Sequence, residues 1–247
     1  MALLVVSKTI RLGTLGWMRT QMPEPPLYGL FGTGGFARPV MPILRETACE
    51  RHAAAETAFI EDVPVAEWVN GVRVMSTEEF LGAPRATTFF NVALADPHAR
   101  MAVCERFLEA GFKPVSIISR HAIVMGPAEI GEGAIICAFC TITTNIRIGR
   151  FFHANIYSYV EHDAIIGDYV TFAPRVNCNG NVTIKDLAYI GAAATIRQGA
   201  HGRPTVIGRG AVVGMVAIVL KPVADGETVA GNPAKPLGKA NVASAAR

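Results

Sequence analysis

A histidine followed directly by an aspartate is the part of this sequence best suited to chemistry. His162 and Asp163 stand in the segment Val160-Glu161-His162-Asp163. An imidazole ionises near neutral pH, and an adjacent carboxylate orients it and stabilises its protonated form. The pair therefore predicts a general base. A lone exposed histidine can equally be a surface residue without a function. The surrounding sequence must therefore distinguish between these two interpretations.

The surrounding pattern is a repeat with a period of six residues. From Ile130 to Ile196 every sixth residue is non-polar, and a second column of small or apolar residues stands four positions after each. The first column extends back to Val124 and Ile118 and, after a slip, resumes at Ile207. Helices repeat near 3.6 residues and simple strands near 2. Hexapeptide repeats are typical of a parallel β-helix, whereas an ordinary β-sandwich would need this periodicity to arise by chance.

The repeat predicts which residue lies next to His162 in the folded chain. Three repeats make a coil of 18 residues, so Gly180 is expected to stack on His162, at the strand spacing of about 5 Å. His162 stands two positions after the inward Val160 and should face solvent. A glycine offers an open backbone N–H, and acyl transfer from a thioester needs a base beside such a donor. Asn155, on the neighbouring corner, is expected to bind the acceptor.

Strands and helices alternate in the segment before the repeats, which predicts a small parallel α/β domain. Strands are expected at 27–31, 58–60, 72–75, 87–95 and 113–118, and helices at 38–50, from 76 and at 96–109. Pro42 is expected to disturb the first helix. The predicted division is a poorly ordered extension at 1–26, a Rossmann-like domain at 27–117, a β-helix domain at 118–237 and a disordered tail at 238–247.

A glycine-rich turn, Gly32-Thr33-Gly34-Gly35-Phe36-Ala37, follows the first strand. Between a strand and a helix, such a turn presents backbone N–H groups and a helix N-terminus to a phosphate. Three interpretations stay open: close packing without a ligand, a dinucleotide, for which the domain is short, and a nucleotide sugar. In the last, Gly34 and Gly35 hold the sugar nucleotide and Asp62 binds its nucleoside; Asp62 is otherwise a solvated carboxylate.

Composition excludes several function classes. The net charge of +3 comes without a basic run or an RNA-binding motif, so no nucleic-acid partner is expected. An apolar run at 2–6 is too short for a signal peptide or a membrane span, so no integral membrane segment is expected, although a weak membrane-surface helix stays possible. Five cysteines, an odd number, fit reduced thiols in a cytoplasmic protein.

Cys137 and Cys140 form a C-x-x-C pair that raises the question of a metal. The two positions should point to different sides of the coil wall, and the sequence has no second pair. Zinc needs four converging ligands, so no metal is expected.

Together these features resemble the hexapeptide-repeat acyltransferases, which fold as a left-handed parallel β-helix. Glu161-His162-Asp163, the segment 177–182 and Gly231-Asn232-Pro233-Ala234-Lys235, joined to a glycine-rich α/β domain, resemble one branch of them over about residues 27 to 237. That branch comprises bacterial nucleotide-aminosugar N-acetyltransferases and sialic-acid O-acetyltransferases. The left hand of the helix comes from this resemblance.

The resemblance implies roles for individual residues. His162 is the base, Asp163 supports it, and Gly180 donates its N–H to the thioester carbonyl. The other implied ligands are Ala192 and Met215 for the pantetheine arm of acetyl-CoA, Lys235 for the nucleotide of coenzyme A, and Gly34, Gly35 and Asp62 for the sugar nucleotide. The family is trimeric, with each active site in the groove between two β-helices.

The sequence departs from the family at three places. Thr171 stands where some members have a second histidine, Gly34-Gly35-Phe36 stands where several have a Gly-His-Gly sequence, and the polar loop at 201–205 is extra. These departures bear on the identity of the acceptor.

The predicted function is acetyl transfer from acetyl-CoA to an amino group of a nucleotide-linked sugar in surface-glycan biosynthesis, by a cytoplasmic homotrimer. Three alternatives remain. One is O-acetylation of a sugar hydroxyl, for example on a sialic acid or a polysaccharide. Another is a non-catalytic nucleotide-sugar-binding β-helix protein, and the third is a dinucleotide oxidoreductase.

Overall fold

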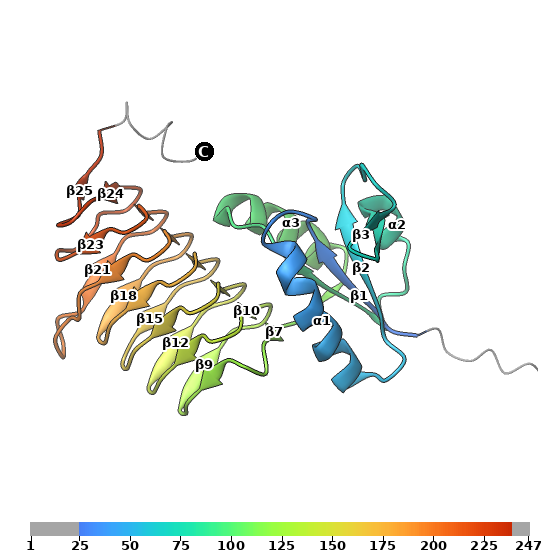
Figure 1. Ribbon diagram of the computed structural model, residues 1–247, viewed down its shortest axis with the longest axis horizontal. Coiled ribbons are helices and arrows are strands. Elements are labelled where there is room, and N and C mark those ends of the chain that lie inside the picture. Colours follow the sequence, from blue (N-terminus) through green and yellow to red (C-terminus); the bar gives the residue numbers. More distant parts are fainter. Residues whose placement is uncertain (1–24, 239–247) are drawn as a thin grey trace, which may run out of the picture.

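The computed structural model describes residues 25–238, which form a small α/β domain followed by a left-handed parallel β-helix (Figure 1). The β-helix runs away from the α/β domain, so that its last coils lie farthest from it. The predictions for residues 1–24 and 239–247 lie outside the described residues.

The α/β domain is built on a six-stranded sheet in the order β3-β4-β2-β1-β5-β6. Its strands are β1 (Leu27–Phe31), β2 (Glu56–Glu61), β3 (Trp68–Val69), β4 (Val72–Ser76), β5 (Thr88–Val92) and β6 (Lys113–Pro114), and its helices are α1 (Ala37–Arg51), α2 (Thr77–Leu81) and α3 (Pro97–Glu109). Within this sheet only β3 and β4 pair antiparallel. Because β1 lies between β2 and β5, the carboxyl ends of β1 and β5 form the switch point where open α/β sheets bind ligands.

The first helix differs from its prediction. α1 continues through Pro42 instead of being disturbed there. Val40, Met41 and Leu44 lie on its buried face, and the burial of that face stabilises the helix more than the one missing N–H weakens it.

The β-helix consists of three sheets of parallel strands, named here in the order in which the chain visits them; only the last strand of the first sheet, β25, pairs antiparallel, with β24. The first sheet contains β7 (Ile117–Ile118), β10 (Ile135–Ile136), β13 (His153–Ala154), β16 (Thr171–Phe172), β19 (Tyr189–Ile190), β22 (Val212–Val213), β24 (Thr228–Ala230) and β25 (Lys235–Pro236). The second contains β8 (Ile123–Val124), β11 (Thr141–Ile142), β14 (Tyr159–Val160), β17 (Asn177–Cys178), β20 (Thr195–Ile196) and β23 (Ile218–Val219). The third contains β9 (Ala128–Ile130), β12 (Ile146–Ile148), β15 (Ile165–Ile166), β18 (Val182–Ile184) and β21 (Thr205–Ile207).

Strand pairing fixes the coil length. Ile136 pairs with Ala154 and Val160 pairs with Cys178, each 18 residues on. We call the three edges corner 1/2, corner 2/3 and corner 3/1, after the sheets they join. Equivalent corner residues 18 apart therefore lie one above the other.

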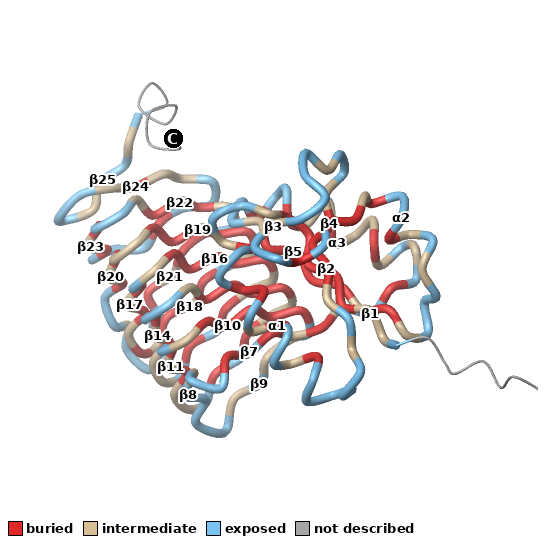
Figure 2. Tube along the Cα trace, turned by 45° about the vertical axis from the view of Figure 1, so that its right-hand side comes forward, coloured by how far each residue is buried: buried red, intermediate tan, exposed pale blue. Residues whose placement is uncertain are grey.

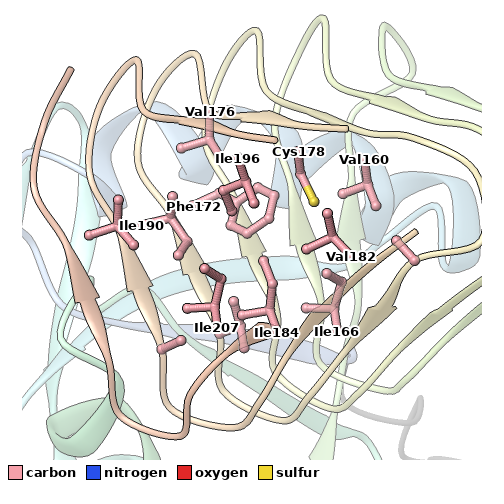
Figure 3. Packing of buried hydrophobic residues seen from close by; sticks show 14 of the residues in the cluster. Val160, Ile166, Phe172, Val176, Cys178, Val182, Ile184, Ile190, Ile196 and Ile207 are labelled. Atoms are coloured by element: carbon pink, nitrogen blue, oxygen red, sulfur yellow. The ribbon is translucent and has the colours of Figure 1, made fainter. Parts of the chain in front are cut away.

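The predicted apolar columns fill the interior of the β-helix. Val160 and Cys178 point into it from the second sheet, Ile166 from the third and Phe172 from the first (Figure 3), and each is at most 2% exposed. In Figure 2 the walls of the coils are largely buried, whereas many of the corners are exposed. Ile118 and Val124 are in phase but 39% and 43% exposed, because they belong to the first coil.

Two cysteines show how the wall separates two cores. Cys140 packs inside the β-helix, and Cys137 packs in the core shared with the α/β domain. The C-x-x-C pair therefore points to opposite sides of the wall, as predicted.

Buried contacts fix the α/β domain to the first sheet and to corner 3/1. Arg100 of α3 is fully buried; it donates from Nη1 to Thr171 Oγ1 (2.8 Å) and from Nη2 to the Tyr169 carbonyl (2.6 Å). Burial lowers the Arg100 pKa to about 10. Phe151 packs in the same core as Phe90. Thr171, which replaces the second histidine of some relatives, is thus part of the domain interface.

No helix among residues 25–238 combines the length and the apolar character needed to cross a membrane.

Two adjacent isoleucines on β15 test which side chains point into the β-helix and which point outward. Ile166 is buried and Ile165 is 47% exposed. We expect Ile166→Ala to lower the free energy of unfolding by about 2–5 kcal/mol because it leaves a cavity, and the matched Ile165→Ala to lower it by less than about 1 kcal/mol. Chemical denaturation at equal protein concentration measures both. Equal losses would contradict the assignment.

Candidate active site

His162, Asp163 and Gly180 meet at corner 2/3. The chain passes this corner between β14 and β15, and again one coil later between β17 and β18. A Cβ atom added to Gly180 would lie 2.5 Å from Nε2 and 2.6 Å from Cε1 of His162. The imidazole therefore lies directly against the glycine, and any side chain at position 180 would displace it.

Asp163 determines which nitrogen of the histidine carries the proton. Its Oδ2 lies 2.8 Å from Nδ1 of His162, and a carboxylate only accepts hydrogen bonds. Nδ1 must then be the donor, which leaves Nε2 with a free electron pair beside Gly180. The side chains of His162 and Asp163 are 42% and 48% exposed, so the pair is accessible to a substrate.

The aspartate is itself held in place. Asp163 Oδ1 accepts a hydrogen bond from Nδ2 of Asn145 (3.2 Å), one coil away. The hydrogen bonds from His162 and Asn145 lower the pKa of Asp163 below its ordinary value. The group therefore stays ionised at neutral pH, and its stabilising effect is lost only as the pH falls through that lowered pKa.

The backbone N–H of Gly180 is available to a ligand. Within residues 25–238 it donates no backbone hydrogen bond, whereas the chain around it is fixed by Asn181 N–H to the His162 carbonyl (2.9 Å) and Gly199 N–H to the Gly180 carbonyl (3.0 Å). A free base and a free N–H donor one coil apart are the two groups that acyl transfer requires.

The other predicted residues lie elsewhere on the β-helix. Asn155, Ala192 and Met215 are at corner 1/2, where the Val216 N–H donates to the Ala192 carbonyl (2.8 Å). Met215 is 71% exposed. Lys235 is exposed on β25, in the last coil. In one chain, none of these is on the same corner as His162.

The glycine-rich turn lies over the first sheet, opposite corner 2/3. The ring of Phe36, which follows Gly35, is 5.1 Å from that of His153 on β13. Gly34 and Gly35 have open space where a side chain would stand. The N-terminus of α1 has no side-chain cap and no acidic residue in its first turn, so it can receive an anion. The apolar core of the β-helix separates this turn from His162.

The carboxylate of Asp62 already binds two side chains of its own domain. Its Oδ1 accepts from Thr77 Oγ1 (2.8 Å) and pairs with Nη2 of Arg106 (2.9 Å). The carboxylate that contacts the turn is Glu61, which accepts from Thr33 Oγ1 (2.6 Å). Sequence reasoning missed Glu61, although its place at the end of β2, beside Asp62, made it an equal candidate.

A cavity connects the turn with corner 1/2. It lies between the two domains, next to the carboxyl end of β5, and its lining includes Phe36, Ala95, His153, Asn155 and Thr171. Asn155 is thus close to the glycine-rich turn of its own chain. The structure brings together two groups of predicted residues, one at corner 2/3 and one between the turn and corner 1/2.

Comparison with known proteins identifies the family of this chain. No family model matches the chain. The GDP-perosamine N-acetyltransferase of Escherichia coli O157:H7 is 49% identical over 211 residues, which are 85% of this chain and 95% of the relative. The chain belongs to the hexapeptide-repeat nucleotide-sugar N-acetyltransferases. Its predicted family, fold and class of reaction are therefore confirmed.

Two solved structures share the whole architecture. WeeI from Acinetobacter baumannii AYE has a TM-score of 0.82 and 43% identity, covering 85% of this chain and 99% of that one. The acetyltransferase domain of PglB from Neisseria gonorrhoeae FA1090, in complex with acetyl coenzyme A, has a TM-score of 0.77 and 27% identity, covering 86% and 100%.

The close contact at Gly180 gives a test of this N-acetyltransferase. We expect Gly180→Ala to lower the rate of acetyl transfer by about 10²-fold or more, because the added methyl displaces the imidazole and crowds the N–H donor. Thiol release from acetyl-CoA measures the rate. Gly126→Ala is the matched control: Gly126 occupies the same corner three coils earlier and has open space around it. A Gly180→Ala enzyme with the wild-type rate would contradict the geometry.

Proposed function

We propose that the protein transfers the acetyl group of acetyl-CoA to the amino group of a GDP-linked amino sugar, such as GDP-perosamine, in the cytoplasm. The observation that carries this proposal is the imidazole of His162 lying against Gly180 with Nε2 unprotonated. The 49% identical relative, matched over 95% of its length, supports the nucleotide, the sugar and the amide product. Because this relative is an N-acetyltransferase, N-acetylation is favoured over the O-acetylation that the sequence left open.

The chemistry follows from these two groups. The acceptor amine attacks the thioester carbonyl, and Nε2 of His162 removes the proton that the nitrogen loses. The Gly180 N–H stabilises the oxyanion of the tetrahedral intermediate. When the C–S bond breaks, the protonated His162 returns the proton to the leaving thiolate. Asp163 stabilises the imidazolium in between, because it remains a carboxylate.

The acceptor is held by the turn of the α/β domain. Gly34, Gly35 and the uncapped N-terminus of α1 bind the diphosphate, and the sugar extends through the cavity past Asn155. Glu61 or Asp62 at the end of β2 contacts the nucleoside. For Asp62 this requires that it keep or exchange its contacts with Thr77 and Arg106.

In the proposed homotrimer, residues of two neighbouring copies together form one active site. A single chain carries the base at corner 2/3 and the nucleotide subsite beyond the opposite wall. In a ring of three copies with one repeated heterologous contact, corner 2/3 of one copy faces corner 1/2 of the next. Ala192 and Met215 of that second copy then line the pantetheine arm, and Lys235 lies toward the nucleotide of coenzyme A.

The catalytic role of His162 predicts a large kinetic effect. With acetyl-CoA and GDP-perosamine, we expect His162→Ala to lower kcat by about 10²–10⁴-fold, since it removes the general base. His121→Ala, at an exposed histidine in the first coil, should keep the wild-type rate. Thiol release together with a hydroxylamine-resistant product measures the reaction. A hydroxylamine-labile ester would favour O-acetylation, and nucleotide-sugar binding without thiol release would favour a non-catalytic protein.

The shared site predicts complementation between two inactive variants. His162→Ala removes the base, and Gly35→Trp fills the open space at the turn. If base and turn come from different copies, co-expressed chains should regain activity at about a quarter of the sites under random mixing. Each variant alone is the control. A co-expressed mixture as inactive as the separate variants would contradict a shared site.

A further inference from the structure

A loop interrupts the repeat directly above the catalytic glycine. Ile184 pairs with Ile207, 23 residues on, whereas Val160 pairs with Cys178 after 18. The five additional residues lie in the segment 197–204, between β20 and β21, which we call the 197–204 loop. It leaves the β-helix at corner 2/3, one coil beyond Gly180, and extends past the turns of the earlier coils (Figure 1).

The base of the 197–204 loop is firmly attached to the site. Gly199 donates to the Gly180 carbonyl (3.0 Å), and Thr205 donates to the Asn181 carbonyl (3.1 Å). At the tip, Ala200 and Arg203 exchange two backbone hydrogen bonds (3.0 and 2.8 Å). The loop is therefore an ordered hairpin, and its two arms reach about 10 Å from the coil at roughly 3.3 Å per residue.

The loop carries positive charge without a partner. Arg197, His201 and Arg203 are all exposed, and the loop contains no acidic residue. Within residues 25–238, neither Arg197 nor Arg203 takes part in an ion pair. The loop starts and ends beside the catalytic corner, because Gly199 and Thr205 donate to the carbonyls of Gly180 and Asn181.

The position of the loop favours the acyl donor, and not the acceptor, as the ligand that the loop contacts. The α/β domain, with its nucleotide subsite, packs on the coils before Gly180, through contacts such as α1 with β7 and Arg100 with Tyr169. The 197–204 loop lies on the other side of Gly180, toward the C-terminal end. Since the α/β domain occupies the N-terminal side, the C-terminal side is open to the rest of a coenzyme A whose thioester is bound at Gly180.

We propose that the 197–204 loop is a phosphate-binding arm, in which Arg197 and Arg203 hold phosphate groups of coenzyme A while the thioester lies at His162. This inference depends on the proposed function, since it takes acetyl-CoA as the donor. Guanidinium groups suit the role because they bind phosphate oxygens through paired hydrogen bonds and keep their charge at every physiological pH.

Steady-state kinetics with two donors tests the proposal. In the full-length double variant R197A/R203A, we expect the KM for acetyl-CoA to rise by about tenfold or more, from the loss of charge-assisted hydrogen bonds. The KM for acetyl-pantetheine, which lacks the phosphates, and the KM for GDP-perosamine should stay within about twofold of wild type. The matched control is Arg209→Ala, an exposed arginine in the same coil at corner 3/1.

Each other outcome overturns the phosphate-binding arm. A KM increase for GDP-perosamine alone would assign the loop to the acceptor. An equal increase for both donors would mean that the loop shapes the thioester site, and an unchanged KM for acetyl-CoA would remove any role in binding it. If wild type transfers no acetyl group, the proposed function fails instead. Calorimetry of coenzyme A binding to wild type and R197A/R203A then still tests the loop, and equal affinities overturn it.

Discussion

The register of the β-helix, 18 residues per coil up to the 197–204 loop, is the constraint on which the rest of the structure depends. Buried aliphatic columns on three walls hold every coil in the same phase, since a shift by one residue would expose one column and bury polar corner residues. Corner positions are therefore stacked at the strand spacing of about 4.8 Å. Only this stacking places the imidazole of His162 against the backbone of Gly180.

The same constraint divides the site. A triangular coil with a filled interior cannot let residues on opposite sides meet, so one chain presents the proposed base at corner 2/3 and the proposed nucleotide subsite across the first sheet. The buried Arg100, bonded to Thr171 and to the Tyr169 carbonyl, fixes the α/β domain on that far side. The proposed ring of three copies joins the two parts. The 197–204 loop belongs to the part that carries the base.

Much of the architecture was predictable because inward positions of a β-helix tolerate only apolar or small residues. From that period alone the coil length followed, and with it the position of Gly180 relative to His162. Contacts between domains were not predictable in the same way. The continuity of α1 through Pro42 depends on its buried face, and the choice between Glu61 and Asp62 depends on Thr33, Thr77 and Arg106, which come close only in the folded chain. The corner that holds Ala192 and Met215 follows from the period, but the copy that uses them does not.

The central claim is that Asp163 fixes the histidine tautomer so that Nε2 faces the reacting centre as a base. The most direct measurement is ¹⁵N NMR of histidine-labelled protein at alkaline pH, where the imidazole is neutral. The account predicts that His162 carries its proton on Nδ1 and that Asp163→Asn changes this distribution. A wild-type His162 protonated on Nε2 would contradict it.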